Sequence, residues 1–123
     1  MDFLIITNNP LVRDEYPDRR VIFADAPPRD VLVTARDYIH KNHKLLTHPL
    51  LGGVKPNESP YKSVLLSCAG ETPDFGSIKI IEECIAVCDK FPQRDVPPPE
   101  DILHDMRTVD CSLFATAMKR NLN

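Results

Sequence analysis

Short apolar runs alternate with amphipathic stretches along most of this chain, and the alternation predicts strands and helices in turn. Continuous apolar runs occur at residues 3–6, 21–24 and 64–66, and Lys44–Thr47 is a further strand candidate, third in chain order. A run without alternating polar residues is typical of a strand buried on both faces, as in a parallel sheet. Two successive strand–helix–strand units therefore predict parallel strands joined by right-handed crossovers.

Apolar residues spaced three or four apart predict two well-defined helices. The first follows a break at residues 25–28, and its buried side carries Val31, Leu32, Ala35, Tyr38 and Ile39. The second follows a turn-rich stretch in which Asp74 or Ser77 can cap the helix. Its buried side carries Ile78, Ile81, Cys84, Ile85 and Cys88.

A proline-rich connector at residues 91–99 separates these elements from a C-terminal helical segment at residues 100–121. The helix is expected to begin at Pro99 or Glu100 and to reach about Lys119. Its regularly spaced apolar residues are Ile102, Met106, Val109, Leu113 and Ala117. The pattern allows one helix or two helices joined near Asp110.

The predicted fold is a single α/β domain over residues 1–123, a small three-layer sandwich. It has a central, mostly parallel sheet of about four strands and flanking helices. Residues 49–62 contain no helix pattern, although parallel neighbours normally need a long crossover. An antiparallel pairing of the fourth strand is therefore the alternative, and it would place Tyr61 and Lys62, instead of Cys68, near His48.

Composition narrows the class of protein. The chain has 123 residues, a net charge of -3 and an isoelectric point near 5.7, which argues against nucleic-acid binding because phosphate recognition needs a concentrated positive field. No apolar run reaches the roughly 18 residues of a membrane span. The N-terminus lacks the pattern of a signal peptide. We expect a cytoplasmic protein that binds neither nucleic acid nor membrane, and the sequence does not fix its oligomeric state.

The cysteines and histidines could bind a metal ion, but a structural role is favoured for them. Cys84 and Cys88 share an apolar helix face, so buried reduced thiols are expected. His40, His43 and His48 could supply nitrogen ligands to a metal, with Asp37 or Glu58. Histidines at a helix end also interact favourably with its carbonyl groups. No metal and no cofactor is predicted.

The segment from His40 to Ser63 has a composition that neither helices nor strands require. It holds three of the four histidines, three of the twelve prolines, the Gly52–Gly53 pair and four lysines. The prolines restrict the backbone and the glycines allow turns that are closed to other residues. We expect an ordered loop with a recognition function.

Candidate site residues lie in this loop and at the first strand end, where Asn8 or Asn9 can cap a short helix beginning at Pro10. In open α/β sheets ligands bind at the carboxyl edge. The predicted ligand-binding residues are Thr7, Asn8, Asn9, Thr47, His48, Gly53, Lys55, Asn57, Tyr61 and Lys62. Lysine charges and backbone N–H groups point to a small anionic ligand. His48 is the best candidate for an acid or base.

Three segments carry a resemblance to a known family: LIITNNPLV at 4–12, RDYIHKNHKLLTHPL at 36–50 and GGVKPNESPYKS at 52–63. They resemble the GrdX family, small proteins encoded beside components of glycine, sarcosine and betaine reductases in anaerobic bacteria. The likeness spans roughly residues 3–90. The family usually has glycine at the position of Asn42 and a Ser-Gly-Ser-like turn near residues 51–53. The resemblance implies a cytoplasmic accessory role in reductive amino-acid fermentation and brings no catalytic residues.

Two functions compete on this basis. The favoured one is a non-catalytic accessory protein that binds a small anionic metabolite or a reductase subunit through residues 40–63. The alternative is a small enzyme that uses His48, with Asn8 and Asn9 orienting the substrate and Lys55 or Lys62 balancing its charge. A closed pocket shared by Asn8, His48 and Lys62 would favour the enzyme, whereas an open surface would favour a partner site.

Overall fold

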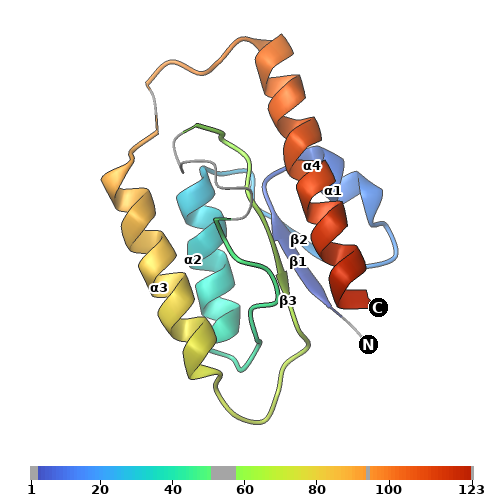
Figure 1. Ribbon diagram of the computed structural model, residues 1–123, viewed down its shortest axis with the longest axis vertical. Helices are drawn as coiled ribbons and strands as arrows, with labels where there is room; N and C mark the ends of the chain where they lie inside the picture. The colour runs from blue at the N-terminus through green and yellow to red at the C-terminus, as the bar shows by residue number, and fades with distance from the viewer. Residues whose placement is uncertain (1–2, 51–57, 94, 123) are drawn as a thin grey trace.

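The computed structural model describes residues 3–50, 58–93 and 95–122, and within them it shows a three-stranded mixed sheet (Figure 1). The central strand is β1 (Leu4–Thr7). It pairs in parallel with β2 (Arg20–Phe23) and antiparallel with β3 (Ser63–Leu66). Phe3, which precedes β1, and Met118, near the end of the last helix, pack in the same core.

Four helices cover the two faces of the sheet in the described part of the chain, as the α/β pattern predicts. They are α1 (Pro10–Glu15), α2 (Pro28–Ile39), α3 (Phe75–Lys90) and α4 (Glu100–Leu122). Helices α2 and α3 lie side by side on one face, and α1 and α4 lie on the other (Figure 1). Among the helices of the described ranges, none combines the length and the apolar character that crossing a bilayer requires.

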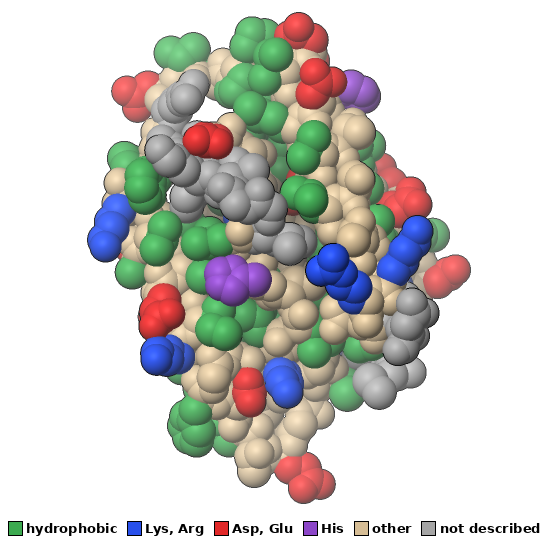
Figure 2. Space-filling model, in the orientation of Figure 1, with side chains coloured by type: hydrophobic (Ala, Val, Ile, Leu, Met, Phe, Trp, Pro, Cys, Tyr) green, Lys and Arg blue, Asp and Glu red, His purple; other side chains and the backbone are tan. Residues whose placement is uncertain are grey.

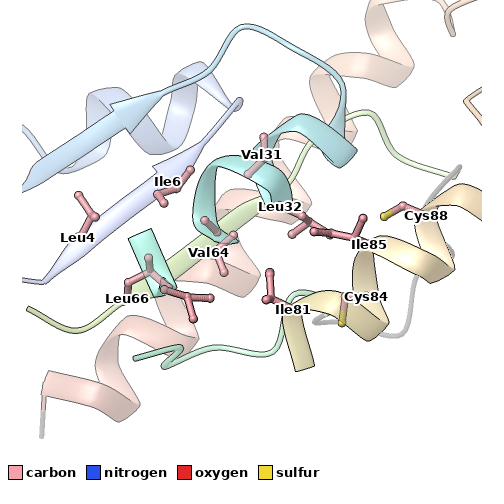
Figure 3. Packing of buried hydrophobic residues seen from close by; sticks show 12 residues of the cluster. Leu4, Ile6, Val31, Leu32, Val64, Leu66, Ile81, Cys84, Ile85 and Cys88 are labelled. Atoms are coloured by element: carbon pink, nitrogen blue, oxygen red, sulfur yellow. The ribbon is translucent and has the colours of Figure 1, made fainter. Parts of the chain in front are cut away.

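Strand β1 is buried on both faces because its side chains alternate between two cores. Leu4 and Ile6 pack with residues of α2 and α3, together with Val64 and Leu66 of β3 (Figure 3). Ile5 packs on the other face in a second core with Phe114 and other residues of α4. A continuous apolar strand is therefore required here, and this explains the run that the sequence shows.

The predicted four-stranded, mostly parallel sheet is wrong, because Lys44–Thr47 does not form a strand. Leu45 makes one isolated antiparallel bridge to Leu66, and the backbone nitrogen of Leu46 donates to the oxygen of Leu65 at 2.9 Å. The Thr47 side-chain oxygen then accepts from the Leu65 N–H at 3.0 Å. The Thr47 side chain thus accepts the hydrogen bond that a backbone carbonyl would accept in a regular strand, and the backbone pairing with β3 ends there.

The antiparallel alternative for the last strand is the one found. Thr7 at the end of β1 pairs with Ser63 at the start of β3. Lys62 therefore lies beside the carboxyl end of β1, while Ser67 and Cys68 follow β3 at the opposite edge. Ser67 and Cys68 are therefore not neighbours of the residues that follow β1 and β2, as a parallel last strand would have made them, since reversing a strand exchanges its two ends.

The helix predictions hold for α2 and α3. The Asp74 carboxylate caps α3 by accepting from the Ser77 N–H at 3.0 Å. Cys84 and Cys88 are buried in the core beneath α3, and burial raises the pKa of both thiols.

Helix α4 continues through Asp110 as one helix, but its apolar spacing misleads about burial. Ile102 and Val109 are 41% and 53% exposed, whereas Phe114 and Met118 are almost fully buried. Only the second half of α4 therefore packs deeply against the sheet. Its first half extends beyond the strand ends.

Thr47 offers a direct test of the sheet edge. Replacing Thr47 by Val keeps the side-chain shape and leaves the buried N–H of Leu65 without its acceptor. The free energy of unfolding should fall by about 1–3 kcal/mol. The measurement is urea unfolding followed by circular dichroism.

Thr108→Val is the matched control, because Thr108 is exposed on α4 and bonds only to a carbonyl of its own helix, that of His104. Equal stability losses in the two variants would contradict the assignment of Thr47 to the sheet edge.

Candidate ligand-binding cavity

The buried side chain of Asn8, at the end of β1, holds three separate segments together. Its Nδ2 donates to the carbonyl oxygens of Ala26 at 2.8 Å and Pro60 at 2.7 Å. Its Oδ1 accepts from the backbone N–H of Lys62 at 2.8 Å. Both amide hydrogens and the amide oxygen are therefore engaged within the fold. Asn8 fixes the positions of the surrounding segments and is not available as a ligand donor.

Asn9 joins the same strand end to two helices. Its Oδ1 accepts from the N–H of Leu11 at 3.0 Å and caps α1. Its Nδ2 donates to the carbonyl of Arg107 at 2.9 Å and to Asp110 Oδ2 at 3.0 Å, both on α4. The fully buried Asn9 is thus a connection between α1 and α4.

Asp110 completes this network from α4. Its Oδ2 accepts a second hydrogen bond, from Ser63 Oγ at 2.8 Å, and the Ser63 hydroxyl lies 2.7 Å from that of Thr7. Burial raises the pKa of Asp110, while the hydrogen bonds from Asn9 and Ser63 and the charge of Lys62 act in the opposite direction. Desolvation is the largest effect, so the carboxylate is held at an electrostatic cost.

Lys62, one of the predicted ligand-binding residues, is half-buried beside the end of β1, where its carbonyl oxygen accepts from the Asn8 N–H. Its pKa is lowered by burial, against the opposing influence of Cys88, Asp110 and Cys84. Ser63 faces α4 and Val64 packs with α2 and α3, so Lys62 belongs to the α2 and α3 side by strand alternation. Within the described residues Lys62 forms no salt bridge.

A cavity of about 640 Å³ opens beside Asn8, beneath the connector that joins α3 to α4. The molecule is visibly hollowed where this connector passes over the body (Figure 2). The described walls come from five parts of the chain: the end of β1, the end of β2, residues 58–61, the connector and the first half of α4. The described lining residues are Asn8, Asp25, Ala26, Pro27, Pro28, Glu58, Pro60, Tyr61, Gln93, Val96, Pro97, Pro98, Pro99, Ile102, Leu103 and Met106.

Arg107 fastens the Tyr61 wall of this cavity to α4. Its Nη1 donates to the Tyr61 hydroxyl at 2.7 Å, and the guanidinium carbon lies 5.6 Å from the centre of the Tyr61 ring. The other side of the guanidinium pairs with Glu100. The cavity wall is therefore held by a contact between segments forty-six positions apart in the chain.

The structure brings only part of the predicted site together. Thr7 and Asn8 bond directly to residues 60–63, and Asn8 and Tyr61 line the cavity. Asn9 is linked to Ser63 only through the Asp110 carboxylate, which accepts from both side chains. Thr47 bonds to the middle of β3 instead. The predicted residues Gly53, Lys55 and Asn57 lie outside the described residues.

The histidines of the loop do not gather. His48 is exposed, lies outside the cavity lining, and its Nδ1 accepts from the Leu50 N–H at 3.1 Å. His43 is buried, with Nδ1 2.7 Å from the carbonyl oxygen of Ser67. His40 is exposed at the end of α2. Over residues 3–50, 58–93 and 95–122, no group of three or more histidines, cysteines or acidic residues is arranged to hold a metal ion.

Sequence reasoning missed the contribution of the last third of the chain. Asp110 stands four residues after Met106 and three before Leu113, so a carboxylate occupies an apolar position of the helix pattern. This irregularity is the signal that could have identified it. The prolines of the connector gave no comparable signal, because they are typical of any linker.

The family model of GrdX, described as GrdX-like protein, matches residues 4–119, nearly the whole chain. The chain belongs to the GrdX-like family. No match was found among curated proteins, and none among solved structures. The match includes the connector and most of α4, beyond the range of about 3–90 that the resemblance covers, so both sides of the cavity belong to the GrdX-like unit.

One departure from the GrdX family pattern has a structural explanation. Asn42 adopts a positive φ of 73°, in the left-handed region where glycine is favoured and asparagine is tolerated. A glycine at this position in the family would meet the same backbone requirement.

Asp110 gives a prediction with a defined pH dependence. Burial raises the pKa of Asp110 in the folded state, so the folded protein binds the carboxyl proton more tightly than the unfolded chain does. Proton binding therefore stabilises the fold at low pH. This stabilisation is lost as the pH rises from the unfolded pKa through the folded pKa. Asp110→Asn keeps an oxygen acceptor and does not titrate, so it should gain stability relative to the natural chain as the pH rises through that window. The measurement is thermal unfolding between pH 3 and 8.

Asp110→Ala should instead lose about 1–3 kcal/mol near neutral pH, because it leaves Asn9 and Ser63 without their acceptor. Asp105→Asn is the control, an exposed carboxylate on the same helix, and should change little. If Asp110→Asn and Asp110→Ala were equally destabilised at pH 7, the description of Asp110 as an acceptor under desolvation would be wrong.

Proposed function

We propose that this protein is a non-catalytic accessory protein of glycine, sarcosine or betaine reductase systems, and that it binds a reductase subunit through the cavity beside Asn8. Membership of the GrdX-like family supports the association with these systems. The cavity supports a binding role, since pockets of about 300–1,000 Å³ with chiefly apolar walls and a few polar groups are typical binding sites.

The observation that carries this proposal is that the polar groups around the cavity are bonded to other groups of the protein. The Asn8 amide bonds to three backbone groups, and the Arg107 guanidinium bonds to Tyr61 and Glu100. These groups stabilise the walls, and the surfaces left facing the space belong mostly to proline, isoleucine, leucine, methionine and valine. Such a lining favours burial of a partner's side chain over acid–base chemistry.

The enzyme alternative receives less support from the geometry. It requires His48, Asn8 and Lys62 to share one pocket, but His48 and Lys62 are outside the cavity lining. An anionic ligand is also disfavoured in this cavity, because the charged residues of its described lining, Asp25 and Glu58, are carboxylates. Anion binding remains a prediction for the part of the loop that contains Lys55.

Two matched substitutions on α4 test the cavity as the binding site. Ile102 lines the cavity and Val109 does not, while both are partly exposed on the same helix. Ile102→Lys should place a charged chain at the opening and weaken binding of a reductase component at least tenfold. Val109→Lys should bind like the natural chain. The measurement is isothermal titration of each purified reductase component into each variant, with thermal unfolding as the check of folding.

Tight binding of a component by Ile102→Lys would contradict the cavity as the binding site. Failure of the natural chain to bind any of the purified components would overturn the proposed function itself.

His48→Ala separates the cavity proposal from the sequence-based prediction that His48 contacts the ligand. Because His48 is exposed and outside the cavity lining, the variant should keep its stability and its affinity for the reductase component. A tenfold loss of affinity in the same titration, without a change in melting temperature, would favour the His48 site instead.

A further inference from the structure

The cavity combines acidic groups with a shortage of hydrogen-bond donors. Asp25 and Glu58 are both exposed, and within the described residues neither forms a salt bridge. Six of the sixteen described lining residues are prolines, which have no backbone N–H to donate. The Asn8 amide hydrogens are already bonded to Ala26 and Pro60. The charged groups of the described walls are therefore carboxylates, beside the polar side chains of Tyr61 and Gln93.

The described cations near the cavity, Arg29, Arg107 and Lys62, are not paired with these carboxylates. Arg29 follows the Pro28 wall but pairs with Asp89 at 2.6 Å. Arg107 pairs with Glu100 and bonds to Tyr61, and Lys62 lies toward α2 and α3. The described residues therefore present a negative field to anything that enters the cavity, and a ligand with positive charge and N–H donors complements it.

The apolar walls define the rest of the ligand. Ile102, Leu103 and Met106 of α4 line the cavity, together with the connector residues Val96 and Pro97–Pro99 that precede the helix. A group that is charged throughout would leave these walls without a partner. A charged end on a chain of several methylene groups would bury its apolar part here and keep its charge near water, as lysine side chains commonly do.

We propose that the cavity receives a lysine side chain of the partner, with its methylene chain against α4 and its ammonium group beside Asp25 and Glu58. This inference rests on the proposed function and specifies what the partner subunit presents. The same chemistry could come from a free alkylammonium ion, so the test includes that source.

The test uses the full-length protein labelled with ¹⁵N and three blocked pentapeptides, acetyl-Ala-Ala-Xaa-Ala-Ala-amide, with lysine, norleucine or glutamate at the centre. Norleucine keeps the methylene chain and removes the charge, whereas glutamate reverses the charge. n-Butylammonium is the free-amine probe. The lysine peptide should shift amide resonances of residues 25–28, 58–61 and 102–106, with an affinity at least tenfold above that of each other probe.

The double variant Asp25→Asn, Glu58→Gln should lower the affinity for the lysine peptide at least tenfold. The control, Glu83→Gln, Asp105→Asn, makes the same change in net charge at exposed positions of α3 and α4 and should bind normally. Equal binding of the lysine and norleucine peptides would overturn the role of the carboxylates. Stronger binding of the glutamate peptide, or of n-butylammonium, would overturn the assignment to a partner's lysine, as would absence of shifts with every probe.

The outcomes separate this inference from the proposed function, because the peptide titrations contain no reductase. Selective lysine binding without binding of any reductase component would leave the cavity chemistry intact and remove the proposed partner. Normal binding of a reductase component by the Asp25→Asn, Glu58→Gln variant would retain the partner and refute the lysine assignment.

Discussion

The burial of two consecutive asparagines at the end of β1 is the constraint on which the rest of the structure depends. Side-chain amides without partners would be costly in this position, so the fold must bring carbonyl and N–H groups to them. Asn8 is satisfied by Ala26, Pro60 and Lys62, and Asn9 by groups of α1 and α4. One turn thereby fixes segments from the front, middle and end of the chain in a single arrangement.

The cavity is a consequence of this arrangement. Packing joins the second half of α4 to the sheet through Phe114 and Met118, while the first half projects past the strand ends with Ile102 exposed. The connector runs from the end of α3 to the start of α4 (Figure 1), and several of its residues line the cavity. Because the polar groups nearby serve the network that holds the walls, the space itself is mainly apolar and acidic. This chemistry supports recognition of a partner better than it supports catalysis.

The GrdX-like match runs from residue 4 to residue 119, so it includes the connector and most of α4 as well as the strands and the loop. The residues that carry the sequence resemblance lie mostly at and around β1, α2 and the loop. In the structure, the Asn8 turn and Pro60 meet the later segments at the cavity wall. The role we propose, binding of a reductase subunit, draws on both parts. Neither part encloses the cavity alone.

The sequence by itself determined the local elements of this protein. Periodic apolar positions gave α2 and α3, the run at residues 3–6 gave the buried central strand, and the absence of a helix pattern in residues 49–62 made an antiparallel last strand an open alternative. Only the tertiary structure decided that Lys44–Thr47 makes one isolated bridge instead of forming a strand. It also decided that the side chains of Thr47 and Asn8 bond to groups within the protein. The same is true of Asp110, which accepts hydrogen bonds from Asn9 and Ser63. Local periodicity reports which face of an element is buried, whereas hydrogen bonds between residues fifty or a hundred positions apart depend on how the elements pack.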